Sequence, residues 1–262
     1  MLETVEIGEA IDMIVQSDYR DLETPTGIMR THVYAPMNQS MNQGAKTYPG
    51  LLLYPEIFQQ TGPIVRLATI FASHGYVVMA PEIYHQHEPP GTVLGYDEEG
   101  KNKGNAYKEK TRLGSFDHDA RVVLAALEQD PRCNGRLGTV GFCIGGHLAF
   151  RAALDPRILG AVCFYPTDLH SGTLGEGKNA DTLRRAAEMK AELVMIFGRQ
   201  DPHVPAAGRA TIYDALTKAE TRFSWHELNA EHAFMRDEGS RYDAEAARLC
   251  IGIALSLFQR TL

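Results

Sequence analysis

The sequence lacks the features that would place the protein in a membrane or on a nucleic acid. No window of its 262 residues approaches the roughly 18 consecutive apolar residues of a membrane span. Basic residues neither dominate nor form runs, since 26 Lys and Arg stand against 33 Asp and Glu, for a formal net charge of −7. The composition therefore predicts neither a membrane protein nor a nucleic-acid partner, and the acidic balance favours solubility.

Cysteine is also scarce, and the four cysteines form neither a metal-binding box nor a small disulfide framework. A reducing, cytoplasmic setting is the default expectation, in which the thiols stay free. The acidic N-terminus has neither the basic start nor the uninterrupted apolar stretch of a secretory signal. No metal or cofactor is predicted, because no carboxylate or thiol completes a convincing ligand set with His85, His87 and His118.

What the sequence does contain is a repeated pattern of strand, loop and helix. Apolar strands are predicted at 51–54, 76–84, 136–142, 159–166, 191–197 and 221–228, with helices at 62–75, 115–130, 143–154, 204–219 and 242–260. This alternation indicates an α/β fold with a mostly parallel central sheet and helices on both faces. No linker divides the chain, so 1–262 is expected to form a single domain. The polar stretch 85–114 has weak periodicity and is predicted to be a loop or lid excursion.

Four chemically capable side chains each follow a separate predicted strand, namely Glu56, Cys143, Asp201 and His232. Ligands of open parallel sheets bind beyond the carboxyl ends of the strands, so these side chains are expected at one edge of the sheet. The thiol, the carboxylate and the imidazole occur in the order nucleophile, acid, base. That is the chain order of the catalytic triad in α/β hydrolases.

The segment GFCIGGH at 141–147 places Cys143 between glycines, directly after a strand and before a helix. At such a sharp turn the nucleophile has a strained backbone and lies close to neighbouring segments. Gly141 and Gly145 lack the side chains that would clash there. The positive end of the following helix favours a thiolate over a thiol. Cys143 is therefore predicted to be a nucleophile.

Four spaced motifs resemble signatures of the dienelactone hydrolase family of α/β hydrolases, namely YPEIF, VGFCIGGHLAF, GRQDPHVP and EHAFMR. APEIYHQHEPPGT also resembles the family's segment after the fourth strand, and the likeness runs from about Thr31 through the C-terminal helix. The resemblance implies the α/β-hydrolase fold. It also implies a cysteine-dependent hydrolase of small-molecule carboxylic esters or lactones, with Cys143, Asp201 and His232 as the triad.

The resemblance implies further roles by position. Glu56 matches a glutamate that contacts the resting cysteine, and Arg236 matches an arginine that binds the substrate carboxylate. The backbone N–H groups of Ile144 and Ile57 match the oxyanion hole. One departure concerns 85–87, which reads His-Gln-His where the dienelactone-hydrolysing member has a second carboxylate-binding arginine. Neither side chain replaces the two-pronged contact of a guanidinium, so dienelactone itself is not predicted as the substrate.

The residues alone leave alternatives open. Asp168 also follows a predicted strand and could serve as the acid in place of Asp201. Glu56 could be a solvated loop residue, and Arg236 could pair with a neighbouring surface acid. A non-catalytic ligand-binding or regulatory protein of the same fold remains an alternative function, as does a thiol redox protein that uses Cys143. Homo-oligomer formation also stays open.

Overall fold

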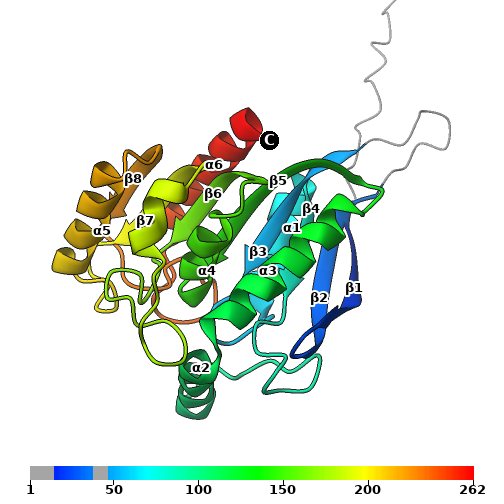
Figure 1. Cartoon of the computed structure of the whole chain (residues 1–262), viewed down its shortest axis with the longest axis horizontal. Coiled ribbons are helices and arrows are strands. Elements are labelled where there is room, and N and C mark those ends of the chain that lie inside the picture. The colour runs from blue at the N-terminus through cyan, green and yellow to red at the C-terminus, as the bar shows by residue number, and fades with distance from the viewer. Residues whose placement is uncertain (1–14, 38–46) are drawn as a thin grey trace, which may run out of the picture.

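One eight-stranded sheet organises the chain, in the order β1-β2-β4-β3-β5-β6-β7-β8 (Figure 1). The structure is a computed structural model that describes residues 15–37 and 47–262. The N-terminal stretch in which no secretory signal was predicted lies outside these residues. The strands are β1 (Val15–Thr24), β2 (Gly27–Pro36), β3 (Tyr48–Tyr54), β4 (Val77–Pro81), β5 (Cys133–Phe142), β6 (Ile158–Phe164), β7 (Glu192–Gly198) and β8 (Phe223–Leu228).

The pairing of the strands confirms the prediction of a mostly parallel sheet. Strands β3 to β8 pair in parallel, whereas β1 and β2 form an antiparallel hairpin that joins the sheet through an antiparallel β2–β4 pair. Strands β4 and β7 are buried along their whole lengths. Such continuous apolar runs are typical of parallel strands that are covered on both faces.

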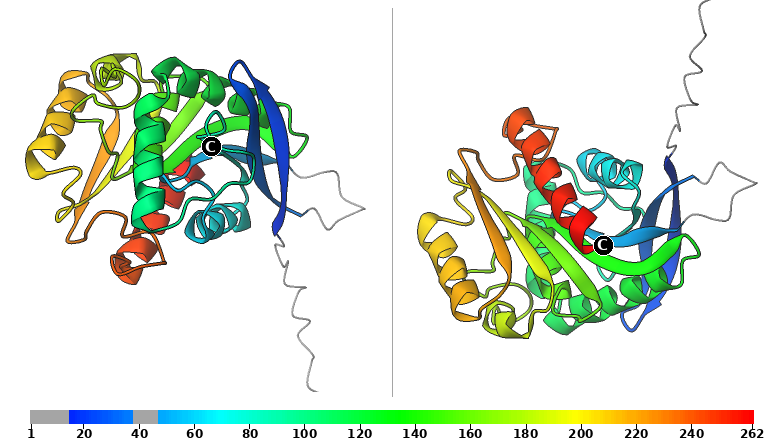
Figure 2. Two further views of the ribbon diagram at one scale, coloured as in Figure 1. Left: turned by 90° about the horizontal axis from the view of Figure 1, so that it is seen from below. Right: turned by 90° about the horizontal axis from the view of Figure 1, so that it is seen from above.

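Helices cover both faces of this sheet, as predicted (Figure 2). They are α1 (Gly62–Ser73), α2 (Glu98–Lys110), α3 (Leu113–Glu128), α4 (Ile144–Ala152), α5 (Ala206–Lys218) and α6 (Ala244–Thr261), with a short 3-10 helix η1 at Leu183–Glu188. Buried side chains of α3, α4 and α5 share one hydrophobic core, and those of α1 and α6 share the other. No helix within the described part of the chain has the length and hydrophobicity needed to cross a membrane.

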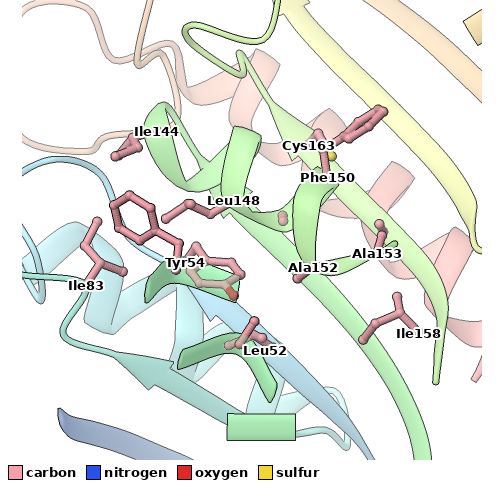
Figure 3. Close-up of a cluster of buried hydrophobic side chains, with 14 of the residues drawn as sticks. Leu52, Tyr54, Ile83, Ile144, Leu148, Phe150, Ala152, Ala153, Ile158 and Cys163 are labelled. Atoms are coloured by element: carbon pink, nitrogen blue, oxygen red, sulfur yellow. The ribbon is translucent and has the colours of Figure 1, made fainter. Parts of the chain in front are cut away.

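The core beneath α4 fixes the turn that precedes this helix. Ile144 and Leu148 are almost completely buried, and they belong to the same cluster as Leu52 and Tyr54 of β3 (Figure 3). Because Ile144 is the first residue of α4, its burial anchors the helix start against the sheet. The residue directly before it, Cys143, is thereby held at the end of β5.

The segment 85–114 differs from the predicted loop, because it contains helix α2. This helix has almost no apolar stripe, which is why hydrophobic periodicity did not reveal it. Its ends nevertheless carry helix-stabilising residues. Asp97 caps the start by accepting a hydrogen bond from the Gly100 N–H group, and lysines lie in the last turn. In Figure 1, α2 lies apart from the two helix layers, at one end of the sheet.

Candidate active site

Cys143 occupies a tight turn between β5 and α4. Its backbone φ is 60°, a value that non-glycine residues rarely adopt. A Cβ atom on Gly141 would collide with the Gly145 carbonyl group, and one on Gly145 would collide with the backbone of Tyr54 and Pro55. The two glycines therefore occur where the turn leaves no room for side chains, as the sequence predicted.

His232 and Asp201 form a buried hydrogen-bonded pair near this turn. The His232 Nδ1 atom lies 2.7 Å from the Asp201 Oδ2 atom, and the residues are 5% and 3% exposed. The other oxygen of Asp201 accepts hydrogen bonds from the His203 and Val204 N–H groups, at 2.7 and 3.3 Å. Burial raises the pKa of Asp201, but these hydrogen bonds and the charge of His232 outweigh it and lower the pKa. The carboxylate is thus fixed in charge and orientation.

His232 lines the same cavity as Cys143, and the two side chains are close enough to interact electrostatically. Burial lowers the pKa of His232, but the charges of Cys143 and Asp201 and the hydrogen bond to Asp201 outweigh it and raise the pKa to about 10. The edge contacts of Tyr165 and His203, with ring centroids 5.0 and 4.6 Å away, confine the imidazole. The arrangement favours an imidazolium next to the cysteine sulfur.

Asp168, the alternative acid, is bonded elsewhere. Its carboxylate accepts hydrogen bonds from the Lys108 ammonium group at 2.8 Å and the Thr173 hydroxyl at 2.9 Å. Since Asp201 is the hydrogen-bonded partner of His232, the geometry favours Asp201 as the acid of the site.

Glu56 is a buried carboxyl group on the wall of the site. It is 3% exposed, and its Oε2 atom lies 3.7 Å from the Arg236 Nη1 atom without a hydrogen bond from any described residue. Burial raises the pKa of Glu56, although the charges of Arg236, His232 and Arg241 partly oppose this. Glu56 is therefore not a solvated loop acid, whereas its predicted contact with the resting thiol stays a prediction.

A hydroxyl group that the sequence analysis missed lies near the sulfur of Cys143. The Thr167 Oγ1 atom is 3.9 Å from the Cys143 Sγ atom. The Thr167 N–H group also bonds to the Cys143 carbonyl at 3.3 Å, and the Thr167 carbonyl contacts His147 Nδ1 at 3.0 Å. No local motif marks Thr167, because the contact depends on how the loop after β6 packs against the turn.

Arg236 points toward the interior of the site rather than to a surface acid. Its guanidinium lies over the Tyr96 ring at 4.4 Å, and its side chain is 16% exposed. The neighbouring acids Asp237 and Glu238 pair instead with Arg66, at 2.6 and 2.8 Å. The alternative of a surface ion pair between Arg236 and these acids is therefore not supported.

Most of the predicted site, though not Asp201, lines one cavity of about 450 Å³, together with Ile57 and residues of α2. The cavity wall includes Glu56, Cys143, His232 and Arg236 of the predicted site. Ile57 also lines it, whereas Ile144 is fully buried at the start of α4. The Ile144 N–H group belongs to the first turn of that helix, where N–H groups have no partner within the helix. Of the two proposed oxyanion-hole residues, Ile144 thus directly follows Cys143, and Ile57 lies in the cavity wall.

The polar side chains of α2 that line the cavity were not identified from the sequence. Lys101, Asn105 and Lys108 line the cavity, and Arg241 contributes a further guanidinium. Lys101, Asn105 and Lys108 are spaced at i, i+4 and i+7, which places them on one face of α2. This shared face could be recognised only once the segment was known to be a helix.

The histidines near position 85 lie outside this cavity wall. His85 Nε2 contacts Asp119 Oδ2 at 3.0 Å, and the His87 ring stacks on Tyr107 with centroids 4.9 Å apart. No cluster suited to a metal ion occurs among the residues that the structure describes.

Comparisons with known proteins identify relatives of this chain. The model of the dienelactone hydrolase family matches residues 32–262. A Saccharomyces cerevisiae protein with the provisional name carboxymethylenebutenolidase is 42% identical over 95% of this chain and 93% of its own length. The carboxymethylenebutenolidase of Pseudomonas putida is 29% identical over 77% of this chain and 81% of its own length.

The solved structures show the same fold. A Klebsiella pneumoniae protein, provisionally named a dienelactone hydrolase, aligns with a TM-score of 0.79 and 21% sequence identity. The alignment covers 94% of this chain and 99% of that chain. The predicted α/β-hydrolase fold is thereby confirmed. The chain belongs to the dienelactone hydrolase family of the α/β-hydrolase superfamily.

Proposed function

We propose that this dienelactone hydrolase-like protein cleaves carboxylic esters or lactones with Cys143 as its nucleophile. The observation that carries the proposal is the buried pair of His232 and Asp201, 2.7 Å apart, with the imidazole next to Cys143 on a cavity of about 450 Å³. A thiol, an imidazole and a carboxylate in this relation have the geometry of a nucleophile, a general base and an orienting acid.

In the first half of the reaction, the Cys143 sulfur attacks the carbonyl carbon of the substrate. The carbonyl π electrons move to oxygen, and the N–H groups of Ile57 and Ile144 stabilise this oxyanion. When the intermediate collapses, the bond to the leaving oxygen breaks and His232 donates its proton to that oxygen. The products are an alcohol or enol and a thioester on Cys143. Loss of one oxyanion donor typically costs about 3–4 kcal/mol of transition-state stabilisation.

In the second half, water hydrolyses the thioester. His232 removes a proton from the attacking water, and Asp201 keeps the imidazole oriented and stabilises its charge. Collapse of the second intermediate releases the carboxylic acid product and restores the cysteine sulfur as the leaving group. The two halves together consume one water molecule and return the site to its starting state.

The nucleophile limits the substrate class. A thiolate is a good leaving group, so the first intermediate returns to substrate unless the alcohol also leaves readily. Activated esters, enol esters and lactones meet this condition, whereas amides do not. The name of the Pseudomonas putida relative supports a lactone substrate. The position of Arg236 in the cavity wall supports a substrate that carries an anionic group.

The test is hydrolysis of an enol ester or enol lactone by the wild type and by Cys143→Ala. We expect Cys143→Ala to lose roughly 10³-fold or more of kcat/KM, as removal of a triad nucleophile does in other enzymes. Cys133→Ala is the matched control, because Cys133 is a half-buried cysteine that does not line the cavity. Undiminished turnover by Cys143→Ala would overturn the proposal.

A further inference from the structure

Helix α2 rests directly on the loop that carries Ile57. Gly104 forms the contact, since a methyl group at this position would lie 2.6 Å from the Ile57 carbonyl oxygen and 2.9 Å from its Cβ atom. Real Cβ atoms do not approach other atoms this closely, so the glycine lets the helix backbone meet the loop. Any larger residue would push α2 and Ile57 apart.

The segment that leads into α2 holds the next two residues of the same loop. The Leu94 N–H group donates a hydrogen bond to the Phe58 carbonyl at 3.1 Å. The Gln59 side chain donates to the Thr92 carbonyl at 3.0 Å, and Gln59 itself is fully buried. Residues 57, 58 and 59 are therefore each held by the stretch 92–104.

The other end of α2 is fixed to the opposite wall of the cavity. The Lys108 ammonium group bonds to Asp168 at 2.8 Å, and both side chains are largely buried. Asp168 directly follows Thr167, whose hydroxyl lies 3.9 Å from the Cys143 sulfur. Helix α2 thus connects the wall that carries Ile57 to the wall that carries Cys143.

We propose that Gly104 is a positioning residue for the oxyanion hole. Its contact with Ile57 sets the distance between the Ile57 N–H group and the acyl carbon that Cys143 attacks. Helix α2 is accordingly a fixed part of the catalytic scaffold rather than a lid. This inference rests on the proposed ester hydrolysis, because it assigns the Ile57 N–H group to the oxyanion of that reaction.

Two reactions of Cys143 distinguish the positioning role of Gly104 from a general loss of structure. Ester hydrolysis requires the oxyanion hole, whereas alkylation of the thiolate by iodoacetamide creates no oxyanion and requires only a reactive sulfur. In Gly104→Ala we expect kcat for an enol ester to fall roughly 10- to 100-fold, the cost of a small misplacement of a catalytic group. We expect KM and the alkylation rate to stay within about twofold of the wild type, since neither depends on the donor.

Gly252→Ala is the control, because Gly252 is also a helical glycine but a methyl group there meets no atom within 4 Å. It should hydrolyse the ester at the wild-type rate. If Gly104→Ala does not fold, Gln59→Met loosens the same loop without adding bulk next to α2, and the same divergence between hydrolysis and alkylation is expected.

Equal losses in hydrolysis and alkylation, or no loss in either, would overturn the role of Gly104 while leaving the hydrolase intact. A wild type that hydrolyses no ester or lactone would overturn the proposed function as well.

Discussion

Replacement of Asp201 by Asn tests how the site orients its imidazole. Asp201 Oδ2 accepts a hydrogen bond from His232 Nδ1 at 2.7 Å, while Oδ1 accepts the His203 and Val204 N–H groups. An Asn side chain keeps its oxygen for these two backbone donors, so its NH₂ group then faces His232. The imidazole must respond by presenting a lone pair at Nδ1, which puts its proton on the nitrogen facing Cys143.

The expected loss in kcat can be estimated from this tautomer change. The corresponding replacement in a serine triad costs about 10⁴-fold. Cys143 itself also raises the pKa of His232, and this contribution does not depend on Asp201. We therefore expect a loss of about 10³-fold, or about 4 kcal/mol in the activation barrier.

The pH profile supplies the second readout. The pKa of His232 is raised to about 10, so the imidazolium that protonates the leaving oxygen is lost only as the pH rises through that value. Asp201 is one of the groups that raise this pKa, so the alkaline limb of kcat should move to lower pH in Asp201→Asn. Circular dichroism should show a folded protein, because the backbone hydrogen bonds of the loop remain.

The assay is enol ester hydrolysis by the wild type, Asp201→Asn and Asp168→Asn across the alkaline range. Asp168→Asn weakens the bond to Lys108 but leaves the pair of His232 and Asp201 intact, so its loss should be smaller and its alkaline limb unmoved. A loss under tenfold in Asp201→Asn, or a larger loss in Asp168→Asn, would refute the assignment of Asp201 as the acid.

Two further predictions concern the charged groups of the cavity wall. Arg236→Ala should raise KM for an ester with a carboxylate group by roughly 10- to 100-fold, the value of a charged hydrogen bond, and should leave KM for a neutral ester of the same shape unchanged. Equal effects on both esters would show that Arg236 does not bind an anion. Glu56→Gln should alter the dependence of unfolding on pH. The pKa of Glu56 is raised in the folded state, so the wild type loses stability as the pH rises from about 4.5, the ordinary value, through the folded value. The free energy of unfolding in urea should show this decline with pH in the wild type and not in Glu56→Gln. Parallel pH dependences of the two proteins would contradict the prediction.

The residues of the proposed triad were predicted from the sequence because each depends on local rules. Gly141 and Gly145 mark the turn at Cys143, since no other residue fits the space there. Asp201 and His232 follow strands of a parallel sheet, and the carboxyl ends of such strands meet at one edge. The parallel strands β3 to β8 were predicted from their apolar or alternating patterns, whereas the antiparallel strands β1 and β2 were not predicted.

The parts that could not be predicted depend on contacts between distant segments. Helix α2 lacks an apolar stripe, and it is stabilised by the close approach of Gly104 to Ile57 and by the bond from Lys108 to Asp168. Arg66 binds Asp237 across 171 positions, which removes the nearest surface partner that Arg236 could have had. None of these three contacts leaves a pattern in the local sequence.

The most direct test of the account is a search for the acyl group on Cys143 during turnover. The wild type is mixed with a slowly hydrolysed activated ester, quenched in acid and digested, and the peptide that contains Cys143 is weighed by mass spectrometry. We predict a mass increase equal to the acyl group on Cys143, which appears within the first turnover and decays as product forms. Hydrolysis at the full rate with no adduct on Cys143, or with the adduct on another residue, would contradict the central claim.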